Sequence, residues 1–145
     1  MSLFVLDASV LAKCFLPSRL EPHYLQAIAL MHSFRKNEIQ LIEPDLAWIE
    51  LGSVFLKSVR RGVFTDAAAR SALRELQKLD IDSVPSTPLM EAAFVLAHRH
   101  NRSFYDCVYL ALAIAAHAEF ITADEKFCTA VAGKAPVKWL GAVSL

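Results

Sequence analysis

Four acidic residues stand in unusually apolar surroundings, and their types indicate one kind of chemistry. They are Asp7, Glu50, Asp106 and Asp124. Carboxylate oxygens are ligands that Mg²⁺ and Mn²⁺ prefer, and no histidine or cysteine is needed beside them. Two such ions, about 3.5–4 Å apart, polarise a phosphoryl group, activate a water molecule and stabilise the leaving oxygen. The four acids are therefore candidates for both the metal ligands and the catalytic residues of a phosphodiester hydrolase.

The rest of the chain alternates short β-like runs with longer amphipathic stretches. Strands are expected near Leu3–Leu6, Ile39–Ile42, Ile81–Val84, Ala118–Thr122 and Val137–Leu140. Helices are expected over Ser9–Leu16, Glu21–Arg35, Asp45–Arg61, Asp66–Leu79, Pro88–His100, Phe104–His117 and Glu125–Ala132. This alternation predicts an α/β fold, a three-layer α/β/α sandwich with a central parallel sheet. Neither a repeat nor a linker interrupts it, so residues 1–145 are expected to form a single domain.

The positions of two of the acids relative to the expected strands suggest where they lie in the sheet. Asp7 directly follows the first expected strand, and Asp124 lies two residues past the fourth. Open parallel sheets bind their ligands beyond the carboxyl ends of the strands. Asp7 and Asp124 are therefore expected at the functional edge of the sheet.

Each acid also has a purely structural interpretation. Asp7 and Asp124 can each cap the helix that follows, and Ser103 to Asp106 matches a capping box. Glu50 can be a buried acid paired with an arginine. For any one acid taken alone, the structural interpretation is the better supported. Capping does not require the carboxylates to gather, so their convergence is what separates the two interpretations.

Several helix boundaries are marked in the sequence. Thr65 is placed to cap one helix, and Thr87-Pro88 offers a cap followed by proline at the first helical position. Gly62 is placed to end the helix that carries Glu50.

Composition restricts the class of protein. The chain has 145 residues, of which 55% are hydrophobic and 21% charged, and this excludes a disordered chain. Its formal net charge is zero, so any contact with RNA must come from local basic patches. Lys57, Arg60 and Arg61, at the end of the Glu50 helix, are RNA-contact candidates. Cations near a helix carboxyl end are equally expected from the helix dipole.

The cysteines and the apolar segments indicate a compartment. Cys14, Cys107 and Cys128 are odd in number and widely spaced, which is typical of unpaired thiols in a reducing cytosol. The first residues carry no basic leader, and the longest apolar stretch is too short to span a bilayer. A cytoplasmic location without membrane attachment is therefore expected.

The four acids lie in short motifs with a definite order. An opening strand ends in Asp7-Ala8-Ser9-Val10, and Glu50 follows on the helix after the second strand. Two motifs come later, Tyr105–Ala113 (YDCVYLALA) and Thr122–Phe127 (TADEKF). In this order and spacing, and over nearly the whole chain, the sequence resembles PIN-domain proteins. It is especially similar to the toxin ribonucleases of VapBC-type toxin–antitoxin pairs.

The resemblance carries expectations of its own. It implies an α/β/α sandwich, endoribonuclease activity on an RNA substrate with Mg²⁺ or Mn²⁺ as cofactor, and frequent homodimers. It also implies inhibition by a small antitoxin protein whose C-terminal segment wraps the toxin near its active site. Carried over by position, the four acids form the acidic cluster. Ser9 assists the first acid, and Glu125 is a lower-ranked outer acid.

Three alternatives remain open from the residues. A metal-dependent phosphatase or dehalogenase begins with a strand followed by Asp-x-Asp, but here the second acid is replaced by Ser9. A receiver-like phosphoacceptor module wants paired acids before its strand and a later lysine, which have no good match. A non-catalytic PIN-like module would bind RNA or protein only, yet all four acids are present. Metal-dependent RNA cleavage that is lost in Asp7→Ala separates these alternatives.

Overall fold

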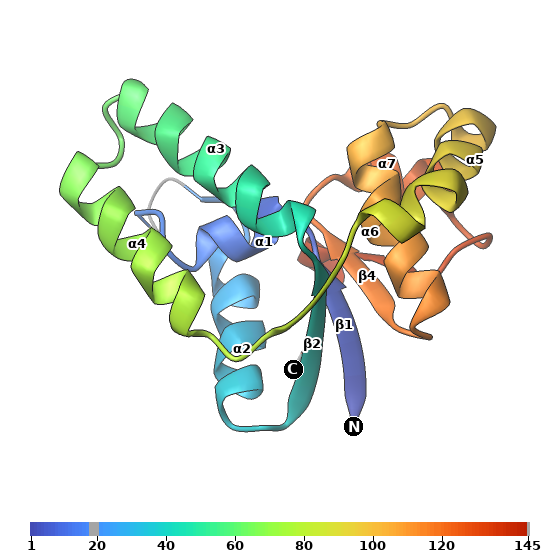
Figure 1. The fold of residues 1–145 in the computed structure, drawn as a ribbon. Coiled ribbons are helices and arrows are strands. Elements are labelled where there is room, and N and C mark those ends of the chain that lie inside the picture. The colour runs from blue at the N-terminus through green and yellow to red at the C-terminus, as the bar shows by residue number, and fades with distance from the viewer. Residues whose placement is uncertain (18–20, 145) are drawn as a thin grey trace.

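The computed structural model describes residues 1–17 and 21–144, and its centre is a five-stranded parallel sheet (Figure 1). The strands are β1 (Ser2–Leu6), β2 (Ile39–Pro44), β3 (Asp82–Val84), β4 (Glu119–Thr122) and β5 (Val137–Trp139). They lie in the order β3-β2-β1-β4-β5, and every neighbouring pair is parallel. The first strand is therefore central, and the sheet is the predicted one.

Helices cover both faces of this sheet. They are α1 (Ala8–Lys13), α2 (Tyr24–Arg35), α3 (Leu46–Arg60), α4 (Asp66–Lys78), α5 (Met90–His100), α6 (Phe104–Ala115) and α7 (Glu125–Val131). Short 3₁₀ turns occupy Thr87–Leu89 and Leu140–Ala142. Figure 1 shows α1 and α2 on one side of β1 and β2, with α5, α6 and α7 on the other. The predicted three-layer sandwich is confirmed, and the α3–α4 hairpin projects beyond the carboxyl edge of the sheet.

The α6 side of the sheet is held by aromatic packing. Every residue of α6 from Cys107 to Ala113 is buried, because this helix contacts β1, β2 and β4. The Tyr109 ring stacks on that of Phe120, with centroids 5.7 Å apart and planes 11° from parallel. Phe127 meets the Phe120 ring edge-on at 5.6 Å. These contacts fix α6 and α7 against the central strands, and so fix the helix ends that carry two of the acids.

Helix boundaries agree with the sequence in some places and differ in others. Thr65 caps α4 by accepting a hydrogen bond from the Ala68 N–H at 3.0 Å, and Gly62, with φ +74°, follows the end of α3. The predicted cap at Thr87 is wrong, since Thr87 lies inside a 3₁₀ turn and α5 begins at Met90. The α2 helix starts at Tyr24, later than predicted, because His23 has a left-handed backbone with φ 59°.

Two further expectations concern covalent and membrane features. All three cysteines are free thiols. Within residues 1–17 and 21–144, no helix has both the length and the hydrophobicity needed to cross a bilayer.

Candidate metal centre

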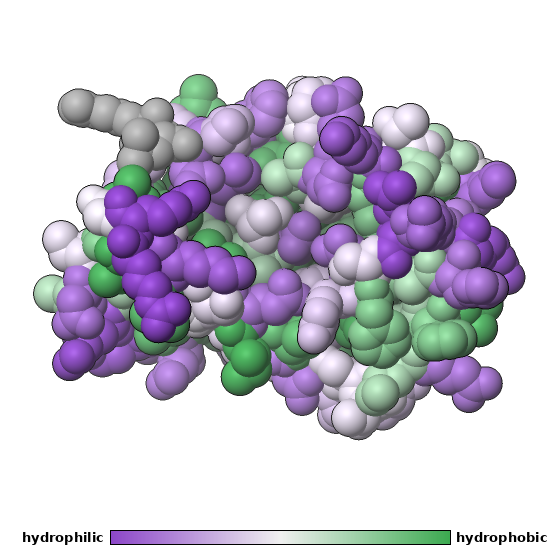
Figure 2. All heavy atoms as spheres, turned by 90° about the horizontal axis from the view of Figure 1, so that it is seen from above, coloured by the Kyte–Doolittle hydropathy of each residue, from purple (hydrophilic) through white to green (hydrophobic). Residues whose placement is uncertain are grey.

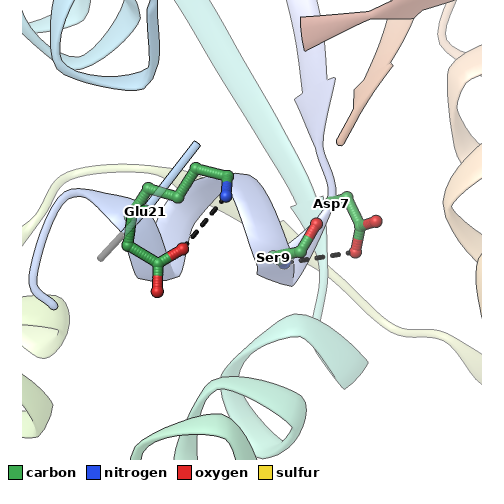
Figure 3. Close-up of polar contacts among 4 residues, drawn as sticks. Asp7, Ser9 and Glu21 are labelled. Carbon is green, nitrogen blue, oxygen red and sulfur yellow. Dashed lines mark hydrogen bonds and ion pairs between the residues drawn. The ribbon is translucent and has the colours of Figure 1, made fainter. Parts of the chain in front are cut away.

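Asp7 lies where β1 passes into α1 and has the most partners of the four acids. Its backbone N–H donates to the Ile121 carbonyl at 3.0 Å, which ties it to β4. Its carboxylate accepts from the Ser9 N–H at 3.3 Å and from the Thr122 hydroxyl at 2.8 Å. Figure 3 shows Asp7 and Ser9 together at the start of α1. Burial raises the pKa of Asp7 in spite of these hydrogen bonds.

Asp124 joins the same site from the end of β4. Its backbone N–H donates to the Thr122 hydroxyl at 3.1 Å, and its carboxylate caps α7 by accepting from the Phe127 N–H at 3.0 Å. The Thr122 hydroxyl therefore stands between Asp7 and Asp124. Both acids are helix caps, as their structural interpretation predicted, and both also lie at the carboxyl edge of the sheet.

Asp106 and Glu50 come to the site on helices. Asp106 is in the first turn of α6, where burial and the Asp7 charge raise its pKa to about 6. The α6 cap is made by the Ser103 hydroxyl and the backbone N–H of Asp106, at 3.1 Å. Burial and the Asp7 charge outweigh a hydrogen bond from the Ser103 side chain to the Asp106 carboxylate, which lowers the pKa of that acid. The Asp106 side chain therefore takes part in the cap as well as in the acidic site.

Glu50 lies in the second turn of α3. Its pKa is raised by burial first, then by the charges of Asp7 and Asp106, while Lys57 acts in the opposite direction. No arginine pairs with Glu50 among the ion pairs of the described residues. The predicted alternative, a structural arginine pair, is therefore not found in this part of the chain.

These four residues form one electrostatic unit, which we call the acid cluster (Asp7, Glu50, Asp106 and Asp124). The charge of Asp7 raises the pKa of both Glu50 and Asp106, and the charge of Asp124 raises those of Asp7 and Asp106. Such mutual repulsion requires proximity. The structure therefore brings together the four acids that the sequence singled out in four separate motifs.

Two polar residues of this region were missed from the sequence. Glu43, on β2, is fully buried, and its Oε1 accepts the Leu6 N–H at 2.8 Å. Burial, and then the Asp7 charge, raise its pKa well above the usual range. Tyr109 is also fully buried, and the charges of Glu50, Asp7 and Glu43 add to burial in raising its pKa. Glu43 and Tyr109 therefore form an inner layer beneath the acid cluster.

The region around Asp7 contains all the unsatisfied buried side-chain oxygens found in the described residues. They are Ser9 Oγ, Glu43 Oε2, Glu50 Oε1 and the Tyr109 hydroxyl. Buried polar atoms in native proteins nearly always have a hydrogen-bond partner. The Tyr109 hydroxyl nevertheless lies close enough to Glu50, and the Ser9 hydroxyl close enough to Asp7, to affect the pKa of those acids. These weakly bonded oxygens beside repelling carboxylates are what a site for a hydrated cation provides.

The donor set decides which cation fits. All donors are oxygens, which suits Mg²⁺ or Mn²⁺ and not the softer ions that prefer sulfur or imidazole. Among the residues that the structure describes, no three His, Cys, Asp or Glu side chains are close enough to coordinate one ion together. Mg²⁺ keeps several of its waters and commonly takes only one or two carboxylates directly. The acid cluster therefore fits a partly hydrated ion.

The remaining site candidates lie around this centre. Ser9 is beside Asp7, with its hydroxyl buried. Lys57, Arg60 and Arg61 are all exposed; Lys57 and Arg61 line a pocket between α1 and α3, and Arg60 does not. Glu125 is exposed in the first turn of α7 and lines a different pocket with Arg102. Glu125 contributes to none of the raised pKa values of the acid cluster.

The match to known proteins covers most of this architecture. The family model of the PIN domain matches residues 4–132, which include all of the acid cluster. The chain belongs to the PIN-domain family. Residues 4–132 run from β1 to the end of α7, so the part matched by the family model holds the carboxyl ends of β1 to β4 and leaves out β5.

Individual PIN-domain relatives agree with this assignment. Ribonuclease VapC1 of Mycobacterium tuberculosis is 34% identical over 88 residues, which cover 60% of this chain and 65% of that protein. Ribonuclease VapC3 of Pyrobaculum aerophilum is 28% identical over 84% of this chain and 89% of that protein. The match to VapC1 therefore spans just under two thirds of that relative's length.

A solved structure supports the fold independently of sequence. A chain of a toxin–antitoxin complex from Klebsiella pneumoniae superposes with a TM-score of 0.60 at 19% identity, covering 95% of this chain and 96% of that one. At this identity the likeness concerns the fold alone.

Proposed function

We propose that this chain is an endoribonuclease that cleaves RNA with Mg²⁺ or Mn²⁺ held by the acid cluster. The observation that carries the proposal is the convergence of the four acids, whose charges raise one another's pKa values. The family and the ribonuclease names of VapC1 and VapC3 support the same reaction. Divalent-metal dependence is general among PIN-domain ribonucleases of the VapC type.

The residues of the site would have different roles in the reaction. Asp7, Glu50, Asp106 and Asp124 would hold the ions, and Ser9 would hold water or a phosphate oxygen beside Asp7. When bound, the ions would supply an activated water and neutralise charge on the phosphoryl group. Thr122 fixes the Asp7 carboxylate by its 2.8 Å hydrogen bond, so that acid is oriented before any ion arrives. The raised pKa of Asp106, about 6, leaves this carboxylate mostly ionised at neutral pH.

We further propose that the protein is the toxin of a toxin–antitoxin pair in the cytoplasm. The toxin–antitoxin complex with the same fold supports an antitoxin partner. Large apolar side chains are exposed on two regions: Ile49 and Leu56 of α3, and Phe94 of α5 with Tyr105 of α6. Figure 2 shows green groups gathered on the side where α5 lies in Figure 1. Such surfaces suit an antitoxin segment and the predicted homodimer.

Cleavage of RNA by the purified protein tests the enzymatic part. Wild-type protein freed of any partner should cut single-stranded or structured RNA in Mg²⁺ or Mn²⁺ and lose this activity in EDTA. Asp106→Asn should lower the rate at least about 100-fold, because it removes a charge placed to hold the ion. Gel analysis of end-labelled RNA measures both.

A matched control uses an acid outside the cluster. Glu75→Gln, on α4, changes the same charge at an exposed position and should leave the rate unchanged. Full cleavage in EDTA, or equal rates for wild type and Asp106→Asn, would overturn the metal mechanism. RNA binding with no cleavage under any metal would favour the non-catalytic alternative.

A further inference from the structure

A second polar pocket opens beside the acid cluster, between α1 and α3. Its volume is about 250 Å³. Its polar lining is Ser9, Lys13, Glu21, Lys57, Ser58 and Arg61, and small apolar residues form the rest. Three of these side chains are cationic and one is anionic, although the chain as a whole has no net charge. The pocket is therefore a local basic site in a neutral protein.

One of the three cations in this pocket is paired with its single carboxylate, and the other two are not. Lys13 is 7% exposed, and its ammonium pairs with the Glu21 carboxylate at 3.0 Å. Figure 3 shows that Glu21 lies beside α1 and apart from Asp7. The pair neutralises Glu21, so Lys57 and Arg61 are left as the cations without a carboxylate partner among the described ion pairs. An anion entering the pocket would meet these two side chains.

The pocket is continuous with the acid cluster on one side. Ser9 lines it, and the Ser9 N–H donates to the Asp7 carboxylate. Lys57 is close enough to Glu50 to lower the pKa of that acid. On the far side, a neighbouring pocket of about 270 Å³ shares Glu21 and Arg61 and extends to Val63. Together the two pockets form a groove that leads away from the acid cluster along α1.

We infer that this pocket binds a backbone phosphate of the RNA, a few nucleotides along the strand from the phosphate at the acid cluster. The inference rests on the proposed function and names the substrate contact of that same site. Arg61 lies eleven residues after Glu50 at the end of the same helix, about 16 Å along its axis, so a strand cut at the acid cluster can reach it with a phosphate a few nucleotides away. Arg61 offers a planar pair of donors that matches two phosphate oxygens, and Lys57 adds a point charge. The net positive lining replaces the basic field that the whole chain lacks.

Neighbouring arginines provide a matched experiment. Arg61→Ala and Arg60→Ala remove the same charge at the same helix end, but only Arg61 lines the pocket. Binding of a fluorescein-labelled 12-nucleotide single-stranded RNA is measured by anisotropy in Mg²⁺, with Asp106→Asn as the background to prevent cleavage. Arg61→Ala should weaken binding about 5- to 20-fold and reduce the slope of log affinity against log salt by roughly 0.7. Arg60→Ala should change the affinity less than about twofold.

Uncharged linkages in the RNA can show which backbone phosphate contacts Arg61. Replacing one phosphate at a time by methylphosphonate should reveal one position, a few nucleotides from the cleavage site, where binding to the Arg61-containing protein falls. At that position Arg61→Ala should add no further loss. Equal effects of Arg60→Ala and Arg61→Ala would reject the pocket, as would a loss with Arg61→Ala that is the same at every linkage.

The result separates the two proposals. RNA cleavage by wild type with no difference between the arginine variants would keep the nuclease and reject the pocket. A clear difference between the variants, with no cleavage by wild type in Mg²⁺ or Mn²⁺, would keep the pocket as an RNA-binding site and reject the nuclease. A loss of antitoxin binding with unchanged RNA binding in Arg61→Ala would assign the pocket to the protein partner instead.

Discussion

The acid cluster and the aromatic stack next to it differ in how well their buried groups are satisfied by their neighbours. In the stack, Tyr109, Phe120 and Phe127 are buried with complementary ring contacts. In the cluster, carboxylates repel one another and buried oxygens lack partners. Tyr109 belongs to both, with its ring in the stack and its hydroxyl beside Glu50. The comparison indicates that rigid apolar packing supports a polar site that is itself unfavourable until a cation is bound.

The largest expected effect is on the stack. Phe120→Ala should lower the free energy of unfolding by about 3–5 kcal/mol, because it leaves a cavity between the buried rings of Tyr109 and Phe127. The loss should be the same in EDTA and in Mg²⁺, since Phe120 contacts no candidate ligand. Urea denaturation followed by circular dichroism measures both conditions. A loss below about 1 kcal/mol, or one that depends on metal, would break the comparison.

The second largest expected effect is that of the cation on the free energy of unfolding. Mg²⁺ at about 100 times its dissociation constant should raise the free energy of unfolding of wild type by about 2.7 kcal/mol. Asp106→Asn should lose most of this gain, whereas Glu75→Gln should keep it. Thermal melts in EDTA and in Mg²⁺ report the difference. If Asp106→Asn gains as much as wild type, Asp106 does not contribute to ion binding.

Glu43 tests the layer between the two regions. Glu43→Met leaves the Leu6 N–H without its 2.8 Å acceptor and should lower the free energy of unfolding by about 1–3 kcal/mol. Glu43→Gln keeps a carbonyl acceptor and resembles the neutral acid that the raised pKa favours, so its loss should be smaller. Urea melts in EDTA at pH 7 compare the two. Equal stabilities would show that the hydrogen bond to Leu6 has no structural weight.

The smallest effect concerns pH in the absence of metal. The pKa of Asp106 is raised from 3.8 to about 6 in the folded protein, so the folded state holds this proton better than the unfolded chain. The associated stability is present below pH 4 and is lost as pH rises through 6. Asp106→Asn should therefore be about 1–2 kcal/mol more stable than wild type in EDTA at pH 7.5, a value reduced for solvent screening.

That advantage should vanish at pH 4, where both proteins are neutral at this position. Melts of the two proteins across this pH range, all in EDTA, provide the measurement. A constant difference between pH 4 and pH 7.5 would contradict the electrostatic origin.

The sequence predicted the sheet and the four acids because both follow from local pattern. Strands and helices alternate clearly, and Asp7 directly follows, and Asp124 lies two residues past, strands whose carboxyl ends lie at the same edge of the sheet. Glu43 could not be found in this way. It stands beside Pro44 at the end of a strand, where an acid ordinarily meets solvent, and only the tertiary structure buries it against Leu6. One available signal was its position one residue before the proline that ends β2.

Other differences also arise from tertiary structure. Tyr109 lies in an apolar run that predicts only core, and its hydroxyl gains meaning when α6 packs against β2 and β4. The residues alone gave Arg60 and Arg61 equal standing. Which of the two arginines faces α1 depends on the backbone conformation of the last turn of α3. A short run of charged residues does not predict that conformation. The role of each member of the acid cluster stays a prediction until the ions are bound.

Thr122 has a mechanical consequence. Its hydroxyl donates to Asp7 at 2.8 Å and accepts from the Asp124 N–H at 3.1 Å, while the Asp7 backbone is bonded to the neighbouring Ile121. A displacement of either strand-borne acid is thereby transmitted to the other. Asp7 and Asp124 are thereby held as one rigid pair at the carboxyl edge of the sheet, whereas Glu50 and Asp106 reach the site from separate helices, α3 and α6. The spacing of the two strand-borne acids is therefore set by a single hydroxyl group.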